Sequence, residues 1–122
     1  MAKTVLIVDD SASLRQLVKM TLTGAGYDVI EAENGQKALD QFNGKKIHLV
    51  ISDVNMPIMD GITFVTKMKA IAAYKFTPVI MLTTESGSDM KAQGQAAGAK
   101  AWVVKPFKPE MILAAVAQLI LP

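Results

Sequence analysis

The amino-acid sequence predicts an α/β domain, a doubly wound (βα)5 fold with a five-stranded parallel sheet and helices on both faces. Five short apolar runs recur along the chain, and segments with helical spacing of apolar residues separate them. This alternation favours parallel strands joined by right-handed crossovers. A length of 122 residues with 51% hydrophobic content suits one such domain. We therefore expect a single domain over residues 1–122, without an output domain.

The strands are predicted where Val, Ile and Leu dominate a short run. Three of these runs lack polar alternation, which is typical of central strands that are covered on both faces. The second run alternates more, so we place it nearer an edge of the sheet. The predicted strands are Val5–Val8, Tyr27–Ala32, Ile47–Ile51, Pro78–Leu82 and Ala101–Val104.

The helices are predicted where apolar residues recur every three or four positions. The glycines of Gly24–Gly26 end the first helix, Asn34 caps the second, and Pro109 suits the first turn of the last. The fourth is marginal, because Gly87 and Gly94 each cost about 1 kcal/mol relative to alanine in a helix. The predicted helices are Ser11–Thr23, Asn34–Phe42, Asp60–Ile71, Ser86–Ala97 and Pro109–Leu121.

Composition excludes several kinds of site. The net charge of +2 is too small to indicate binding to nucleic acid or to an anionic membrane. The absence of cysteine excludes disulfides, thiolate metal sites and iron–sulfur clusters, and His48, as the only histidine, is expected to be structural. No apolar stretch approaches the roughly 18 residues of a membrane span, and we identify no secretion signal. We expect a cytoplasmic protein without membrane insertion.

Polar residues follow four of the predicted strands. Asp9 and Asp10 follow the first strand, Asp53 the third, Thr83 the fourth and Lys105 the fifth. The carboxyl ends of parallel strands meet at one edge of the sheet, where such folds bind ligands. We therefore expect three carboxylates, a hydroxyl and an ammonium group to gather there.

These groups favour a magnesium-dependent phosphoryl-transfer site. Two like unit charges about 4 Å apart cost about 4 kcal/mol at an effective dielectric constant near 20, so the three carboxylates need cations beside them. Lys105 supplies one positive charge, and all-oxygen ligands favour Mg²⁺ for the rest. An ionised carboxylate at such a site is a nucleophile toward phosphorus and would form an aspartyl phosphate.

The motifs at these strand ends resemble those of the response-regulator receiver domains of two-component signalling. The motifs are Val8-Asp9-Asp10, the stretch Asp53–Gly61, Thr83 and the tripeptide Lys105-Pro106-Phe107. The resemblance covers essentially the whole chain and is strongest to the stand-alone chemotaxis members of the family. It implies the flavodoxin-like strand order 2-1-3-4-5.

The resemblance also implies roles for the acidic residues. Asp53 would accept a phosphoryl group from a histidine kinase. Asp9, Asp10 and Asp53 would hold Mg²⁺ together with the backbone carbonyl of Asn55. Asn55 and Glu85 match positions that tune hydrolysis of the phosphoryl group in receiver domains. The chain would catalyse only its own phosphorylation and dephosphorylation, so it would not be an enzyme in the ordinary sense.

Further residues match the positions that propagate the signal. Thr83 and Lys105 would contact the phosphoryl oxygens, and the Lys105–Pro106 peptide bond is usually cis in the family. Thr83 and Trp102 match the switch pair, but Trp102 is larger than the usual Tyr or Phe, and Thr84 replaces a smaller residue. Both changes crowd the space into which the aromatic side chain swings. A downstream target protein would bind the face formed by strand 4, helix 4, strand 5 and helix 5.

The last helix carries an unusually uncharged outer face. Ile112, Ala115, Val116 and Leu119 are predicted to face the sheet, which leaves Met111, Ala114, Gln118 and Leu121 on the other side. A surface helix normally has a polar outer face. We expect this face to contact a partner or a second copy of the chain in a homodimer, with fraying of an apolar C-terminus as the alternative.

Two other functions fit an α/β fold with acids at the strand ends. An aspartyl-phosphate phosphatase of the haloacid dehalogenase type needs a second acid two residues after its nucleophile, and Asn55 stands there. A flavodoxin-like electron carrier holds its FMN phosphate in a Ser/Thr/Gly-rich loop after the first strand, where Asp9 and Asp10 would repel it. The receiver interpretation is therefore the leading hypothesis.

Overall fold

The sheet has five parallel strands in the order β2-β1-β3-β4-β5. The structure is a computed structural model that describes residues 3–42, 44–54, 56, 58–83, 88–105 and 108–120. The strands are β1 (Thr4–Val8), β2 (Asp28–Ala32), β3 (Leu49–Asp53), β4 (Val79–Thr83) and β5 (Ala101–Val104). The predicted fold class and strand order are confirmed, and β2 lies at an edge as expected.

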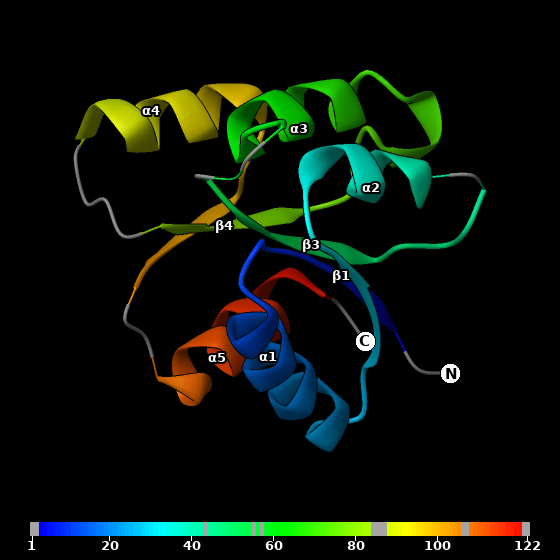
Figure 1. The fold of residues 1–122 in the computed structure, drawn as a ribbon, viewed down its shortest axis with the longest axis vertical. Coiled ribbons are helices and arrows are strands. Elements are labelled where there is room, and N and C mark those ends of the chain that lie inside the picture. Colours follow the sequence, from blue (N-terminus) through cyan, green and yellow to red (C-terminus); the bar gives the residue numbers. More distant parts are fainter. Residues whose placement is uncertain are drawn as a thin grey trace.

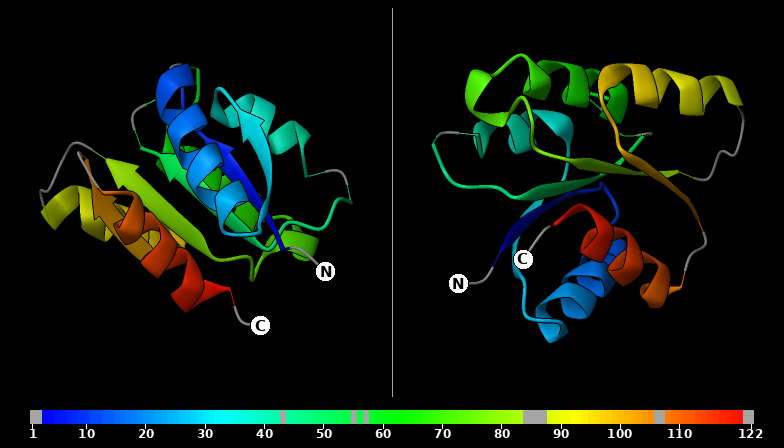
Figure 2. Two further views of the ribbon diagram at one scale, coloured as in Figure 1. Left: turned by 90° about the horizontal axis from the view of Figure 1, so that it is seen from below. Right: turned by 180° about the vertical axis from the view of Figure 1, so that it is seen from behind.

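Helices cover both faces of the sheet, so the fold has three layers (Figure 1). One face is covered by α2 (Gly35–Asp40), α3 (Gly61–Lys69) and α4 (Ser88–Ala97), and the other by α1 (Ala12–Gly24) and α5 (Pro109–Leu119). Figure 2 shows α1 and α5 side by side against the sheet. A short 3-10 helix, η1 (Ala72–Tyr74), which the sequence analysis did not predict, lies between α3 and β4.

The two layers of helices enclose two apolar cores. Side chains of a strand alternate between its faces, so Leu6 and Val8 of β1 enter the core beneath α2 and α3, while Val5 and Ile7 enter the core beneath α1 and α5. All four are buried. Burial of such a side chain contributes about 1.5–3 kcal/mol, and this explains why the central strands lack polar alternation.

Three helices begin at side-chain caps that the sequence places there. The side chains of Ser11, Asn34 and Asp60 each accept a hydrogen bond from the backbone N–H three residues later, at 3.3, 2.8 and 2.9 Å. Such a cap stabilises a helix by about 1 kcal/mol. At the other end of α1, Gly26 has φ +95°, a conformation that glycine adopts without a steric penalty.

The third strand lies two residues further along than predicted. We predicted Ile47–Ile51, whereas β3 is Leu49–Asp53. The ladder with β4 continues to the pair of Asp53 and Leu82, and the N–H of Val54 donates to the carbonyl of Leu82 at 3.0 Å. Pairing with a neighbouring strand therefore makes Asp53 the last residue of the strand.

His48 has the structural role that we expected, although it precedes the strand and does not lie inside it. Its Nδ1 accepts a hydrogen bond from the N–H of Thr4 at 3.0 Å, and its own N–H donates to the carbonyl of Thr4 at 2.9 Å. Burial, together with the charges of Lys3 and Lys46, lowers the pKa of this imidazole. A neutral ring suits a nitrogen that accepts a hydrogen bond.

The faces of α5 are those that the sequence predicts. Ile112 and Val116 are buried against the sheet, whereas Met111 is 48% exposed and Ala114 and Gln118 are also exposed. The predicted end of this helix, Leu121, lies outside the described residues. None of the described helices has the length and apolar character that crossing a membrane would require.

Candidate functional site

Three carboxylates meet at the carboxyl edge of the sheet. Asp9 and Asp10 follow β1, and Asp53 ends the neighbouring strand β3. One carboxylate oxygen from each lies within 4.8 Å of the other two. Asp9 and Asp53 are only 1% and 6% exposed, whereas Asp10 is open to solvent. The fold thus gathers, as predicted, acids that are more than 40 residues apart in the sequence.

Asp9 is held in a fixed orientation by its neighbours. Its Oδ1 accepts a hydrogen bond from the N–H of Ser11 at 2.8 Å. Its N–H donates to the carbonyl of Ala32 at 3.1 Å, and its carbonyl accepts from Nη1 of Arg15 at 2.6 Å. These bonds leave Oδ2 directed toward the other charged groups of the site.

Lys105 bridges two of the three carboxylates. Its Nζ lies 3.2 Å from Oδ2 of Asp9 and 3.3 Å from Oδ1 of Asp53. The backbone N–H of Lys105 donates to the carbonyl of Thr83 at 2.6 Å, which fixes the end of β5 against the end of β4. One ammonium facing three carboxylates leaves an excess of negative charge at this edge.

This donor set fits a hard divalent cation. All of the groups that converge are carboxylate oxygens, which are the ligands that Mg²⁺ prefers, and Asp10 keeps one side of the cluster open to solvent. A bound cation would offset the negative charge that Lys105 leaves. The residues present therefore match the chemistry of a magnesium site.

The surroundings of Asp53 disfavour its ionised form. Burial raises the pKa of Asp53, the charge of Asp9 raises it further, and Lys105 opposes both effects without cancelling them. The ionised form of Asp53 is therefore less favourable in the folded chain than in water. A cation beside Asp53 would relieve this cost.

A measurement of the free energy of unfolding in the absence of metal can test whether the pKa of Asp53 is raised. Because the pKa of Asp53 is raised on folding, its stabilising contribution is present at acid pH and is lost as the pH rises through the folded-state pKa. In EDTA at pH 7, Asp53→Asn should therefore have a larger free energy of unfolding in urea than the parent. The difference should shrink as the pH falls toward 3.8, the ordinary value for this carboxyl. Equal free energies of unfolding for the parent and Asp53→Asn at pH 7 would contradict a raised pKa of Asp53.

Thr83 and Trp102 lie on the same face of the sheet. Thr83 is buried at the end of β4, and Trp102 lies on β5 opposite Met81, two residues before Thr83. Trp102 packs beside the core beneath α2 and α3, and its Nε1 is buried without a hydrogen-bond partner among the described residues. The two predicted switch residues are therefore neighbours on adjacent strands.

Four predicted positions lie outside the described residues. They are Asn55, Thr84, Glu85 and Pro106. The carbonyl ligand, the two hydrolysis-tuning residues, the crowding by Thr84 and the cis peptide bond therefore stay predictions.

Gly61 belongs to the site, although the sequence analysis gave it no such role. It is the first residue of α3, and its N–H donates to the carbonyl of Val54 at 2.7 Å. A Cβ on Gly61 would lie 2.1 Å from the carbonyl oxygen of Asp53. The start of α3 thus packs directly on the backbone of Asp53, and only glycine leaves room for that contact. The motif from Asp53 to Gly61 includes this glycine. Its contact with the backbone of Asp53, however, forms only when the chain folds and could not be predicted from the sequence.

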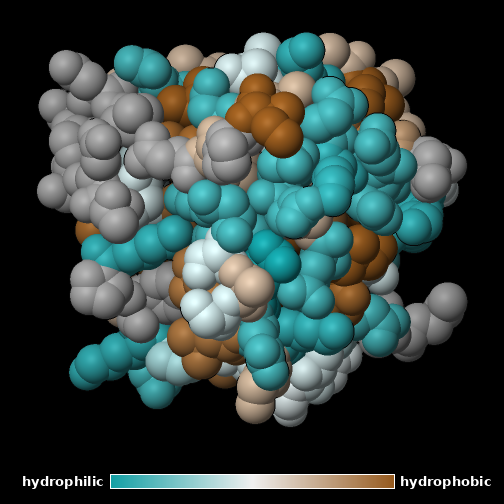
Figure 3. Space-filling model, in the orientation of Figure 1, coloured by the Kyte–Doolittle hydropathy of each residue, from teal (hydrophilic) through white to brown (hydrophobic). Residues whose placement is uncertain are grey.

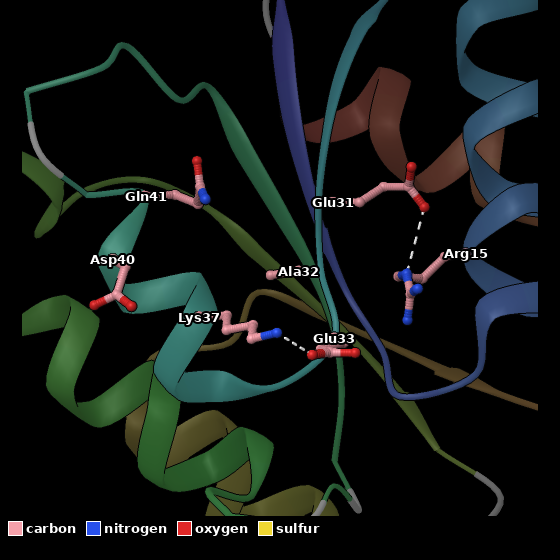
Figure 4. Close-up of a pocket in the computed structure, with 7 residues that line it drawn as sticks. All are labelled: Arg15, Glu31, Ala32, Glu33, Lys37, Asp40 and Gln41. Carbon is pink, nitrogen blue, oxygen red and sulfur yellow. Dashed lines mark hydrogen bonds and ion pairs between the residues drawn. The ribbon is translucent and has the colours of Figure 1, made fainter.

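A separate hollow of about 380 Å³ lies between β2, α2 and α1 (Figure 4). Arg15 pairs there with Glu31 at 3.3 Å, and Lys37 pairs with Glu33. Both cations that line the hollow are therefore neutralised by carboxylates of the chain. Arg15 links this hollow to the acidic cluster, because its Nη1 also donates a hydrogen bond to the carbonyl of Asp9.

Comparison with known proteins identifies the family of this chain. Residues 5–117 match the response regulator receiver domain. The chemotaxis protein CheY homolog of Campylobacter jejuni is 40% identical over 109 residues, which are 88% of this chain and 84% of that protein. The chemotaxis protein CheY of Bacillus subtilis is 38% identical over 117 residues, or 95% and 96% of the two chains.

A solved structure shows the same architecture. The chemotaxis protein CheY4 of Vibrio cholerae superposes with a TM-score of 0.94 at 45% sequence identity, covering 98% of this chain and 99% of that one. The strand order, the acids at the strand ends and these relatives agree. The chain belongs to the response regulator receiver domain family.

Proposed function

We propose that this chain is a phosphorylation-activated signalling switch of the chemotaxis type, which accepts a phosphoryl group on Asp53. The observation that carries the proposal is the contact of Lys105 with both Asp53 and Asp9, at 3.3 and 3.2 Å, beside the exposed Asp10. In this proposal Asp53 would be the nucleophile, Lys105 would supply the cation, and Asp9 and Asp10 would be metal ligands at the same edge of the sheet.

The phosphoryl-transfer step would use Asp53 as the nucleophile. A carboxylate oxygen of Asp53 attacks the phosphorus of a phosphohistidine on the kinase; the new P–O bond forms as the P–N bond breaks, and the imidazole leaves. Lys105 and Thr83 would neutralise charge on the phosphoryl oxygens. Asp9, Asp10 and Asp53, with the carbonyl of Asn55, would hold Mg²⁺, which supplies further charge neutralisation when bound.

The signal would leave through contact with another protein. Phosphorylation of Asp53 adds negative charge next to Lys105, and the backbone bond from Lys105 to Thr83 couples the ends of β4 and β5. We place the downstream target on the face formed by β4, α4, β5 and α5, where Val104 is 37% exposed and Met111 is 48% exposed. A homodimer through α5 stays a prediction that sedimentation at several concentrations would test.

The proposal also includes how the phosphoryl group is removed and where the chain acts. Asn55 and Glu85 would tune hydrolysis of the aspartyl phosphate, as in the chemotaxis members that the sequence resembles. The chain would then act in the cytoplasm on its own phosphoryl group and turn over no external substrate. The relatives, named as chemotaxis proteins, do not favour a phosphatase or an electron carrier.

The proposal is tested by incubating the purified chain with Mg²⁺ and acetyl phosphate. Intact-mass spectrometry should show one added phosphoryl group, and EDTA should abolish the addition. Fluorescence of Trp102, the only tryptophan, reports in the same sample whether the predicted switch residue changes its environment. Absence of an adduct in the parent protein would overturn the proposed function, whereas an adduct without a change in fluorescence would show that Trp102 is fixed.

A further inference from the structure

Ile58 combines two unfavourable features in one residue. It is the only non-glycine residue of the described chain with a positive φ, at +72°, and its side chain is 82% exposed. The left-handed conformation is rare for a β-branched residue, whereas Gly, Asn and Asp adopt it more readily. A single exposed apolar side chain is ordinary on a protein surface, but a strained one is not.

The loop that contains Ile58 is closed against the phosphoacceptor. The N–H of Gly61 donates to the carbonyl of Val54 at 2.7 Å, and Gly61 packs on the carbonyl oxygen of Asp53. The chain that leaves β3 at Asp53 therefore returns to that residue at Gly61, and this return is consistent with the positive φ of Ile58. It does not explain why the turn uses an isoleucine.

Packing among the described residues gives no reason for the isoleucine. Met56 and Met59, on either side of Ile58, are partly buried and pack beside the core beneath α2 and α3. Met59 also fills the space next to Gly35, with its Cγ and Sδ each 3.0 Å from the position of a Cβ on that glycine. The inward positions of the loop are thus taken by methionines, and the side chain of Ile58 points to solvent. No packing contact among the described residues accounts for isoleucine at this position, and its 82% exposure leaves the side chain available to another molecule.

The position of Ile58 indicates which kind of partner would contact its side chain. The loop starts at Asp53 and ends on the backbone of Asp53, so it lies at the carboxyl edge from which a phosphoryl donor approaches. A protein that brings a phosphohistidine to Asp53 has to cover this edge. Figure 3 shows a mainly hydrophilic surface with small separate apolar patches on the side seen in Figure 1. The exposed side chain of Ile58 would offer a docking protein an apolar contact in the loop that follows Asp53.

We propose that Ile58 is a specificity-determining contact for the phosphohistidine-bearing protein that phosphorylates Asp53. This inference rests on the proposed function and names the partner surface of that same site: an apolar patch beside the phosphorylated histidine. Ile58 takes no part in the chemistry at phosphorus. The rate of transfer from a small phosphodonor, which makes no such contact, should not depend on the side chain at position 58.

The test compares two phosphodonors on the same variants. The protein donor is the histidine-phosphorylated domain of a chemotaxis-type kinase chosen because it phosphorylates the parent chain, and the small donor is acetyl phosphate. Ile58→Asn should lower the rate constant for transfer from the protein donor at least about fivefold, the change expected when an interface contact of about 1 kcal/mol is lost. Its rate with acetyl phosphate should stay within about twofold of the parent. Ile58→Val, which keeps an apolar β-branched side chain, should retain most of the transfer rate.

The same variants give a second measurement that is independent of transfer. Because asparagine adopts a positive φ more readily, Ile58→Asn should raise the midpoint of thermal unfolding by about 3–6 °C. Phe76→Asn is the matched control: Phe76 is 88% exposed, lies before β4 near the opposite edge of the sheet and has no positive φ. The control should leave both the transfer rate and the unfolding midpoint close to those of the parent.

Other outcomes would overturn the inference. Unchanged transfer from the protein donor to Ile58→Asn would show that Ile58 makes no contact of consequence. Equal slowing with both donors would mean that Ile58 acts by shaping Asp53, and equal slowing in Phe76→Asn would mean that apolar surface in general is responsible. Failure of the proposed function looks different: the parent itself would then take no phosphoryl group from acetyl phosphate.

Discussion

Replacing Asp53 with asparagine will abolish phosphoryl transfer to this chain. The amide lacks the anionic oxygen that attacks phosphorus, and it removes one of the three carboxylates that lie within 4.8 Å of one another. We expect no adduct in intact-mass spectra after incubation of Asp53→Asn with Mg²⁺ and acetyl phosphate, a loss of at least about 100-fold in rate. The parent, treated in parallel, should carry one phosphoryl group.

A matched carboxylate controls for the general effect of removing charge. Asp28 is exposed at the start of β2, at the amino edge of the sheet, so Asp28→Asn should be phosphorylated as fast as the parent. A phosphoryl group found on Asp53→Asn, and located by peptide mapping on another residue, would remove Asp53 from the proposed mechanism. Loss of the adduct in Asp28→Asn as well would indicate a nonspecific effect of charge.

Gly61→Ala will strongly destabilise the fold and damage the site at the same time. The added Cβ would lie 2.1 Å from the carbonyl oxygen of Asp53 and 3.0 Å from two further backbone atoms of Asp53 and Val54. Backbone atoms cannot rotate away as a flexible side chain can, so either α3 or the end of β3 has to move. We expect a loss of about 3 kcal/mol or more in the free energy of unfolding, measured in urea, and slower phosphorylation by acetyl phosphate.

Gly24→Ala provides the comparison for this prediction. Gly24 is the last residue of α1, and a Cβ there would meet nothing within 4 Å. Alanine at that position should leave the free energy of unfolding unchanged or raise it by up to about 1 kcal/mol, because alanine loses less chain entropy on folding. Similar stabilities for Gly61→Ala and Gly24→Ala would contradict the close contact between α3 and Asp53.

The architecture and the acidic cluster could be predicted because they depend on local patterns. Apolar runs such as Val5–Val8 mark buried parallel strands, and the residue that ends each strand falls at a common edge. That rule alone brings Asp9, Asp53 and Lys105 together. The caps at Asn34 and Asp60 likewise follow from the preference of short polar side chains for helix starts.

Other features depend on contacts that no local pattern encodes. The extent of β3 follows from its pairing with β4, and the sequence around Ile47 and Asp53 fits either register. The raised pKa of Asp53 results from burial and from Asp9, which is 44 residues away in the chain. Isoleucine rarely adopts a positive φ, so the conformation of Ile58 could not be predicted from its residue type. Each of these features is set by tertiary structure.

The strand order also limits how far a signal has to travel in this domain. Asp53 ends β3, and β5 is separated from β3 only by β4. With neighbouring strands about 4.8 Å apart, Asp53 and the strand that carries Trp102 are separated by roughly 10 Å. Thr83 lies between them and is joined to Lys105 by a 2.6 Å backbone hydrogen bond. If Asp53 is the acceptor and the target binds beside β5, as proposed, only one strand separates the site of modification from the site of recognition.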